Sequence, residues 1–276
     1  MNLRLSTYNC NSVRANFENV RKVMNNCDIV FLQELLLCKS DLPILEELND
    51  DFENVAFVQD READGIMEGR PTRGVAILWR KSLSSYVTPL LVDDNVIGII
   101  LSNVTSKVLL LNLYMPCDMQ TLDALDNYRS MLAKLGVLLR EQNLSNIILT
   151  GDFNADPRKG RFWGELGVFM NTFSLCILDK QLPQDSFTYL CPAKSTTSWL
   201  DHVLCTHELI HSVTNMKIDY EGALYDHFPL YFDLTINLEL DEKVEEEVRR
   251  KEYVNWNRLT ENDKHNLKVR IDLLLN

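Results

Sequence analysis

The sequence lacks the features that mark membrane-spanning and disulfide-stabilised proteins. No apolar run approaches the roughly 20 residues that a transmembrane helix needs. The first residues lead directly into a strand-like segment, so we expect neither a signal peptide nor a membrane association. The seven cysteines are scattered singly, without a Cys-x-x-Cys pair. We therefore expect no disulfide framework and no structural zinc site, but a reducing, intracellular environment.

Basic residues are also scarce. The 276 residues contain 28 Lys and Arg against 40 Asp and Glu, which gives a formal net charge of −12. Such a chain should not bind polyanions by its overall charge, so any action on nucleic acid requires local groups that overcome the negative field. The length and the 46% hydrophobic content suit one large domain with a sizeable core, with or without an appendage.

Short aliphatic and β-branched runs predict most of the secondary structure. Helical periodicity predicts a long helix over 121–142 and shorter helices near 17–24 and 42–48. Many strands with few helices predict sheets covered by helices. Composition changes after Asn237, so we expect a domain over 1–236 and a charged, partly helical linker or appendage over 237–276. The expected strands are 3–8, 29–32, 55–58, 75–79, 96–101, 108–114, 146–150, 200–205 and 230–234.

Polar side chains stand where predicted strands end, a place from which they can be held rigidly around a shared cleft. Taken singly, each has an ordinary explanation: Asp152 and Asn154 after Gly151 are typical of a turn, and a tyrosine just before Pro116 is usually a packed aromatic. The order and spacing of the whole set favour a functional site. Its members are Asn9, Glu34, Tyr114, Asp152, Asn154, Asp201, Asp226 and His227.

Together these motifs resemble the endonuclease/exonuclease/phosphatase superfamily, which includes apurinic endonucleases. They look most like the endonuclease domain of non-LTR (LINE-type) retrotransposons of the chicken-repeat kind. The resemblance covers about residues 3–236, and the tail around Val254-Asn255-Trp256 resembles the segment that joins such a domain to a reverse transcriptase. The matching segments are Leu32-Gln33-Glu34, Gly74-Val75-Ala76-Ile77-Leu78-Trp79, Gly151-Asp152-Phe153-Asn154-Ala155-Asp156, Ser198-Trp199-Leu200-Asp201-His202 and Asp226-His227-Phe228-Pro229-Leu230.

The resemblance implies an α/β fold of two packed, mostly antiparallel β-sheets flanked by helices, a four-layer sandwich like that of DNase I. It implies Mg²⁺-dependent hydrolysis of a phosphodiester bond, with Mn²⁺ as a substitute, leaving a 3′-OH and a 5′-phosphate. The implied partner is duplex DNA, nicked in the nucleus to prime reverse transcription by a reverse transcriptase region of a longer polyprotein.

The resemblance also implies roles for individual residues. Glu34 would be the main metal ligand, supported by Asn9 and Asp226, since oxygen ligands suit a hard cation such as Mg²⁺. Asp152 would orient and deprotonate the attacking water or assist the leaving oxygen.

The remaining implied roles concern the phosphate. Asn154 and His227 would donate hydrogen bonds to phosphoryl oxygens as charge develops. Asp201 would hold the His227 ring and stabilise its protonated form, and Tyr114 would bond a phosphate oxygen.

Substrate contacts are expected from Thr188, Ser198 and Arg73. Two positions depart from the superfamily pattern: Tyr225 replaces a frequent serine before Asp226, and Cys117 replaces a frequent asparagine. Two modest basic groups are candidates for local phosphate contacts. They are Arg70, Arg73, Arg80 and Lys81, and Arg158, Lys159 and Arg161.

Alternative functions remain open at this point. The same metal core serves several phosphate esters, so an RNA-directed or other phosphodiesterase is one alternative, and a non-catalytic, host-adopted interaction domain is another. His207-Glu208-Leu209-Ile210-His211 matches the zinc protease pattern His-Glu-x-x-His. That chemistry needs both histidines on one face of a stable helix, and here strand-like residues flank the motif.

Overall fold

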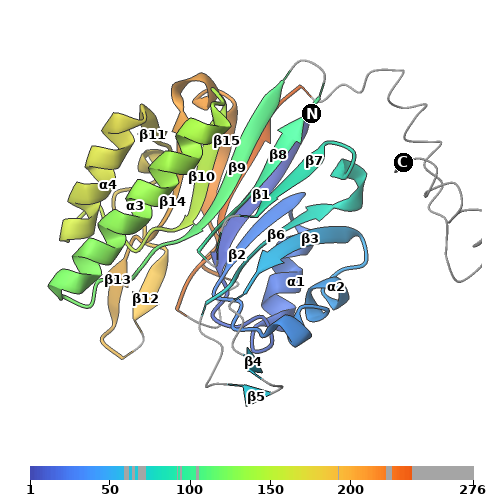
Figure 1. Cartoon of the computed structure of the whole chain (residues 1–276), viewed down its shortest axis with the longest axis horizontal. Coiled ribbons are helices and arrows are strands. Elements are labelled where there is room, and N and C mark those ends of the chain that lie inside the picture. The colour runs from blue at the N-terminus through green and yellow to red at the C-terminus, as the bar shows by residue number, and fades with distance from the viewer. Residues whose placement is uncertain are drawn as a thin grey trace, which may run out of the picture. The chain divides into compact units, whose positions relative to one another are not determined.

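Two six-stranded β-sheets pack face to face, and helices cover their outer faces (Figure 1). The structure is a computed structural model, and it describes residues 1–58, 62–63, 66–67, 73–91, 93, 95–103, 106–191, 193–221 and 226–237. Arg70, Tyr225 and the predicted appendage beyond Asn237 lie outside the described residues. No helix in the described part of the chain is long and apolar enough to cross a membrane.

Each sheet has one parallel pair of strands at its centre and antiparallel neighbours elsewhere. In sheet 1, the order is β15 (Val213–Ile218), β16 (Leu230–Thr235), β1 (Asn2–Asn9), β2 (Ile29–Gln33), β6 (Val75–Arg80) and β3 (Phe52–Phe57). In sheet 2, the order is β11 (Leu175–Ile177), β14 (Asp201–Thr206), β10 (Ile147–Asp152), β9 (Lys107–Tyr114), β8 (Val96–Ser102) and β7 (Val87–Leu91). The parallel pairs are β1/β2 and β9/β10. The predicted mostly antiparallel sandwich is therefore confirmed.

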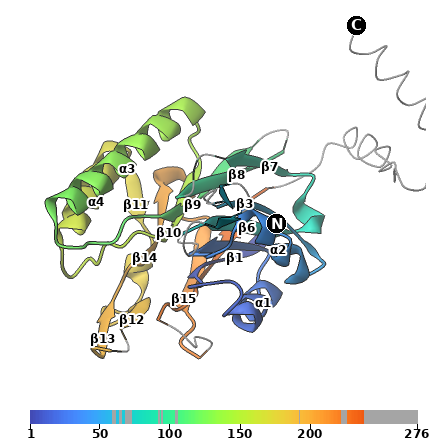
Figure 2. The same ribbon diagram turned by 60° about the horizontal axis from the view of Figure 1, so that its bottom comes forward.

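The shorter elements complete the architecture. Figure 2 shows the hairpin of β12 (Tyr189–Cys191) and β13 (Thr196–Ser198) projecting beyond the sheets, while β4 (Glu62–Ala63) pairs with β5 (Ile66–Met67). The α-helices are α1 (Phe17–Asn25), α2 (Ile44–Glu47), α3 (Leu122–Gln142) and α4 (Arg161–Thr172). The 3₁₀ turns are η1 (Lys39–Asp41), η2 (Lys81–Leu83), η3 (Asp179–Gln181) and η4 (His207–Leu209).

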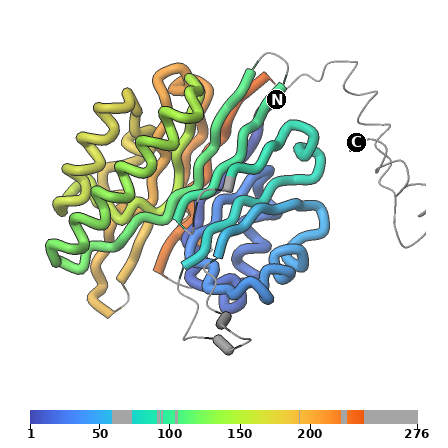
Figure 3. The backbone as a smooth tube through the Cα atoms, viewed as in Figure 1, coloured from blue at the N-terminus to red at the C-terminus, as the bar shows by residue number. Residues whose placement is uncertain are grey.

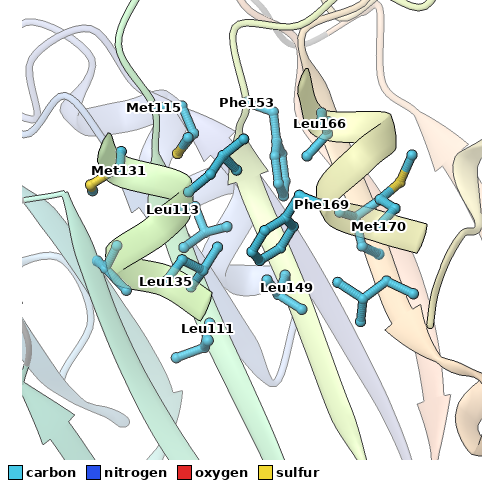
Figure 4. Close-up of a cluster of buried hydrophobic side chains, with 14 of the residues drawn as sticks. Leu111, Leu113, Met115, Met131, Leu135, Leu149, Phe153, Leu166, Phe169 and Met170 are labelled. Atoms are coloured by element: carbon cyan, nitrogen blue, oxygen red, sulfur yellow. The ribbon is translucent and has the colours of Figure 1, made fainter. Parts of the chain in front are cut away.

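The predicted long helix is α3, and it packs with α4 on the outer face of sheet 2. Thr121 caps its start, because the Thr121 hydroxyl accepts a hydrogen bond from the Ala124 amide. Figure 4 shows the apolar contact layer, in which leucines of β9 and β10 meet side chains of both helices. The labelled residues in that layer are Leu111, Leu113, Met115, Met131, Leu135, Leu149, Phe153, Leu166, Phe169 and Met170. Helix α1 covers sheet 1 in the same way, with Val20, Val23 and Met24 buried.

This topology brings the predicted site residues to one end of the sandwich. In each sheet a helix connects the two parallel strands, α1 from β1 to β2 and α3 from β9 to β10, so both strands end at the same edge. Strand β1 contacts β10, and β2 contacts β9 and β10. The close approach of β9 and β10 requires Gly151, whose added Cβ would lie 2.0 Å from the Leu113 carbonyl oxygen.

A buried ion pair fixes the loop that follows β10. The His202 Nδ1 lies 2.7 Å from Asp179 Oδ2, and its Nε2 lies 2.8 Å from the Ala155 carbonyl oxygen. Both partners are acceptors, so the ring carries both N–H protons and a positive charge. Burial alone would lower the pKa of His202, but the charge and hydrogen bond of Asp179, with the Ala155 carbonyl, raise it overall.

We expect Asp179→Asn to lower the free energy of unfolding by about 3–5 kcal/mol at about pH 6, because it leaves the buried His202 ring without its counter-charge. Because the pKa of His202 is higher in the folded than in the unfolded protein, its protonation stabilises the fold. This stabilisation is complete below the ordinary histidine pKa of about 6.5 and is lost as the pH rises through the pKa of the folded state. The difference from wild type should therefore shrink at alkaline pH. Urea unfolding across pH measures it, and His211→Gln, at an exposed histidine, is the control.

Candidate active site

Glu34 stands directly after β2 and turns its carboxylate into the cleft. Its φ of +52° lies in the left-handed region, which is uncommon for a residue with a side chain and is held here by backbone hydrogen bonds on both sides. The Ser12 amide donates to the Glu34 carbonyl, and the Leu35 amide donates to the Gly74 carbonyl. Glu34 Oε1 accepts hydrogen bonds from Asn9 Nδ2 and from the Tyr114 hydroxyl, both at 2.9 Å.

Asn9 joins the two sheets at the site. The same Asn9 Nδ2 that donates to Glu34 also donates to Asp152 Oδ2 at 3.0 Å, and the Asn11 amide donates to Asn9 Oδ1. Asp152 ends β10 and is 1% exposed. Burial and the negative charge of Asp201 raise the pKa of Asp152 to about 7, although the His227 ring and the Asn9 amide oppose the shift.

His227 and Asp201 form a buried pair beside Asp152. His227 Nδ1 lies 2.9 Å from Asp201 Oδ2, while its Nε2 lies 3.8 Å from Asp152 Oδ2. The second distance is too long for a direct hydrogen bond, so an intervening oxygen atom can bridge the two groups. Burial opposes protonation of His227, but Asp201, Asp152 and Asp226 together raise the pKa of the ring to about 10. The ring is therefore a cation at neutral pH.

The carboxylates suit a divalent cation. Atoms of Asp152, Asp201 and His227 lie within 4.8 Å of one another, and Glu34 and Asp226 line the same hollow. Within the described part of the chain, His227 is the only basic group within ion-pair distance of these acids. Asp201 Oδ1 is buried without a hydrogen-bond partner there. An excess of hard oxygen donors over positive charge is the chemistry that favours Mg²⁺ or a similar ion.

The cleft consists of two adjoining hollows that share Glu34, Tyr114 and Cys117. The first has a volume of about 590 Å³ and the second about 600 Å³. Besides the shared residues, the first is lined by Asp118, Gln120, Asp152, Asn154, Ala155, Asp156, Lys159, Gly160, Phe162, Tyr189, Ser198, Leu200, Asp226 and His227. Arg73 lines the second.

The predicted substrate contacts differ in their access to the cleft. Ser198 and Asn154 line the first hollow, and Asn154 Nδ2 donates one of its two N–H groups to the Met115 carbonyl at 2.9 Å. Thr188 is fully buried, and its hydroxyl accepts hydrogen bonds from the Leu200 and Asp201 amides. Thr188 therefore lies behind the wall of the cleft and supports Asp201, while its expected role as a substrate contact stays a prediction.

The Tyr114 hydroxyl also has a specific position. Burial and the charge of Glu34 raise the pKa of Tyr114, so the phenol keeps its proton. Its single O–H group donates to Glu34, and a bond to a phosphate oxygen would require it to exchange that partner. Cys117, at the position where the superfamily often has asparagine, is exposed in the cleft wall.

The members of the two basic groups that the structure describes do not form continuous patches at the site. Arg80 ends β6 opposite Phe52 and pairs with Asp28 at 3.1 Å, toward the other end of sheet 1. In the second group, Arg158 pairs with Asp156 and Arg161 with Asp118. Lys159 is 60% exposed and lines the first hollow.

The His-Glu-x-x-His segment does not form a zinc protease helix. His207–Leu209 is the single 3₁₀ turn η4, between β14 and β15, and both histidines are exposed. One turn cannot bring two histidines four positions apart to one face of a stable helix. The protease alternative is therefore wrong.

Tyr189 is a cleft residue that sequence reasoning missed. Its ring lies 4.9 Å from the His227 ring, and its backbone forms a β-bridge with His227. The Leu190 amide donates to the Asp226 carbonyl at 2.7 Å. The β12–β13 hairpin thus contacts the backbone and the side chain of His227. The only sequence feature that pointed to Tyr189 was its position directly after Thr188. Its contact with His227, 38 positions further along the chain, could not be predicted from that position.

Fold and site together define a metal-dependent phosphoesterase, in which a buried Asp–His pair faces a cluster of carboxylates at the open end of a two-sheet sandwich. The family model of the endonuclease/exonuclease/phosphatase family matches residues 6–223. The chain belongs to this family, which confirms the predicted enzyme class of nuclease or phosphodiesterase.

Solved structures share the fold at low sequence identity. The AP endonuclease LMAP from Leishmania major is 15% identical, with a TM-score of 0.69 over 86% of this chain and 88% of its own. The endonuclease domain of TRAS1, a telomere-specific non-LTR retrotransposon, is 14% identical, with a TM-score of 0.62 over 85% and 98%. The 3′ phosphatase NExo from Neisseria, bound to a product DNA hairpin, is 18% identical, with a TM-score of 0.66 over 85% and 100%. The sequence has no match among the curated proteins.

Proposed function

We propose that this protein is a Mg²⁺-dependent DNA endonuclease that cuts one strand of a duplex and leaves a 3′-OH and a 5′-phosphate. Within that activity we propose target-site nicking for a non-LTR retrotransposon, in the nucleus and together with a reverse transcriptase. The observation that carries the proposal is the continuous hydrogen-bonded chain from Tyr114 through Glu34 and Asn9 to Asp152, with the His227–Asp201 pair beside it.

In the proposed hydrolysis, different side chains accept the proton and bind the phosphoryl oxygens. A water molecule attacks phosphorus, its proton passes to Asp152 Oδ2, and the bond from phosphorus to O3′ breaks while O3′ takes up a proton from a solvent water. Asp152 can accept a proton because its pKa lies near neutrality. His227, held by Asp201, and the second N–H of Asn154 donate hydrogen bonds to phosphoryl oxygens as negative charge grows.

Glu34, Asn9 and Asp226 would hold the metal ion. When bound, the ion polarises the phosphoryl group and offsets the charge of the surrounding carboxylates. In this structure Asn9 Oδ1, the atom that would face a cation, accepts a bond from the Asn11 amide, and Asn11 Nδ2 donates to Asp226 Oδ1 at 3.4 Å. Asn11 therefore helps to orient two of the three proposed ligands.

DNA as the substrate is supported by two similar structures, an AP endonuclease and an enzyme bound to a product DNA hairpin. The net charge of −12 works against DNA, so we expect the isolated protein to bind DNA weakly without Mg²⁺. Target selection then depends on a partner domain.

A supercoiled-plasmid assay tests the proposal. Wild-type protein should convert supercoiled plasmid to the nicked circle with Mg²⁺ and not with EDTA, and nicks should be extended by a polymerase without prior removal of a 3′-phosphate. His227→Ala should lower the rate by about 10²–10³-fold, since it removes a donor to the developing charge. His211→Ala, at an exposed site, should match wild type. Intact plasmid alongside cleaved RNA or a cleaved small phosphodiester would contradict DNA as the substrate.

A further inference from the structure

A layer of buried polar side chains lies one step below the candidate active site, between the two sheets. Thr7 and Asn112 each precede a site residue, Asn9 and Tyr114, by two positions on the same strand. Side chains two apart on a strand share a face, so both lie directly beneath the site. Polar groups are unusual in the contact between two sheets, and neither residue takes part in the chemistry described above.

Asn112 hydrogen-bonds across the contact between the sheets. It belongs to β9 of sheet 2, and its Nδ2 donates to the Leu32 carbonyl at 2.8 Å and to the Ala76 carbonyl at 2.9 Å, both in sheet 1. Its Oδ1 accepts from Gln33 Nε2 at 2.6 Å, and Gln33 Nε2 also donates to the Thr7 hydroxyl at 3.0 Å. Thr7, Gln33 and Asn112 are fully buried. One side chain of sheet 2 is thus bonded to two strands of sheet 1.

The active site needs the two sheets to be held in a fixed position relative to each other, which we call registration, because both sheets contribute residues to the site. Asn9 ends β1 of sheet 1 and Glu34 directly follows β2, whereas Tyr114, Asp152 and Asp201 lie on strands of sheet 2. Apolar contacts between sheets are non-directional, whereas hydrogen bonds specify distance and angle. A misplacement of about 1 Å in a catalytic group can reduce the rate about 100-fold.

We infer that Asn112 is a positioning residue that holds the two halves of the active site in register through its hydrogen bonds to β2, β6 and Gln33. The inference rests on the proposed hydrolysis of phosphodiesters at this site. Of the proposed metal ligands, Asn9 ends β1, Glu34 directly follows β2 and Asp226 precedes β16, so none of them lies on a strand of sheet 2, whereas the proton acceptor Asp152 ends β10 of sheet 2. Loss of registration should therefore impair the chemical step and spare metal binding.

The variant Asn112→Leu keeps the approximate volume and removes all three bonds. We expect kcat for plasmid nicking to fall about 100-fold, while KM for plasmid and the dissociation constant for Mn²⁺, measured by calorimetry without DNA, each change less than about twofold. A general loss of structure would weaken Mn²⁺ binding together with kcat. A kcat within about twofold of wild type in folded Asn112→Leu would overturn the inference, and so would an equal loss of Mn²⁺ affinity and kcat.

A matched control separates registration from the loss of any buried hydrogen bond. Thr150 pairs with Asn112 in the β9–β10 register and is equally buried, but its hydroxyl donates to the His202 carbonyl within sheet 2. Thr150→Val should keep kcat within about twofold of wild type. A loss as large as that of Asn112→Leu would count against the inference.

A second variant covers the case in which Asn112→Leu does not fold. Gln33→Met removes the bond to Asn112 Oδ1 and leaves the two bonds of Asn112 Nδ2, so it should show a smaller drop in kcat, again without loss of Mn²⁺ affinity. An unchanged kcat in Gln33→Met would then contradict the proposal that these buried polar side chains hold the two sheets in register.

A small substrate keeps the test independent of DNA. If wild-type protein hydrolyses bis(p-nitrophenyl) phosphate but does not nick plasmid, the proposed DNA substrate is wrong, and the same variants compared on the small ester still test Asn112. A drop in kcat on the ester in Asn112→Leu, but not in Thr150→Val, would support the positioning role in that case too.

Discussion

Asp152→Asn is expected to lower kcat for plasmid nicking by about 10²–10⁴-fold, the range for loss of a general acid or base. Asparagine has nearly the same shape but cannot accept the proton of the attacking water. It would also present an amide in place of an oxygen that accepts a hydrogen bond from Asn9 and faces His227. The variant should remain folded, because it removes a buried negative charge close to that of Asp201.

The pH profile gives an independent check on Asp152. Its pKa, raised to about 7 by burial and Asp201, predicts that kcat falls as the pH falls below about neutrality, because protonation removes the proton acceptor. Asp152→Asn should lose this acid limb along with its activity. A matched control is Asp233→Asn, at another buried aspartate, which pairs with Arg4 at 3.0 Å away from the cleft; it should retain kcat. Undiminished nicking by Asp152→Asn would remove Asp152 from the chemistry.

Glu34→Gln is expected to lower activity by about 10³-fold or more, because loss of the main metal ligand removes several kcal/mol of charge stabilisation. The substitution preserves an oxygen acceptor for the Tyr114 hydroxyl but removes the negative charge and one of the two oxygen donors of the side chain, both of which suit a hard cation. Mn²⁺ binding, followed by calorimetry, should weaken in parallel, and a higher Mn²⁺ concentration should restore part of the rate.

The control for Glu34 is Glu53→Gln on the edge strand β3, where the carboxylate accepts a hydrogen bond from the Ser84 hydroxyl. It should change neither Mn²⁺ affinity nor nicking. Normal Mn²⁺ affinity in Glu34→Gln would mean that other carboxylates, such as the Asp152 and Asp201 group, hold the ion.

Much of the sheet architecture could be predicted from sequence because buried strands read as continuous aliphatic runs. Every strand expected from such a run is present, and α3 begins one residue after the predicted start at Thr121. Helix α4 is not predicted, since Gly164 and Gly167 lower helix propensity within its twelve residues. Its burial against α3 and sheet 2 outweighs that propensity.

The sequence could predict which side chains lie close together at the site, but it could not predict the contacts between them. Residues at strand ends indicated which side chains would gather, but Asn9 and Asp152 are 143 positions apart, and no local pattern encodes a contact at that separation. The burial of Thr188 and the pairing of Arg158 and Arg161 with nearby acids depend on tertiary packing. The hydrogen bonds of Asn112 also depend on tertiary packing, because in the sequence Asn112 is only a single polar residue within the leucine run of β9.

The position of β1 has a consequence for the newly made chain. The first strand lies inside sheet 1, between β2 and β16, and β16, the last strand in the described part of the chain, is its direct neighbour (Figure 3). On the ribosome, Asn9 and Glu34 emerge early, but β1 has an unpaired edge until residues 230–235 have been made. His227 and Asp201 also arrive late. We therefore expect a nascent chain to have no nuclease activity until nearly the whole domain has emerged, because folding by domain units cannot close this sheet sooner.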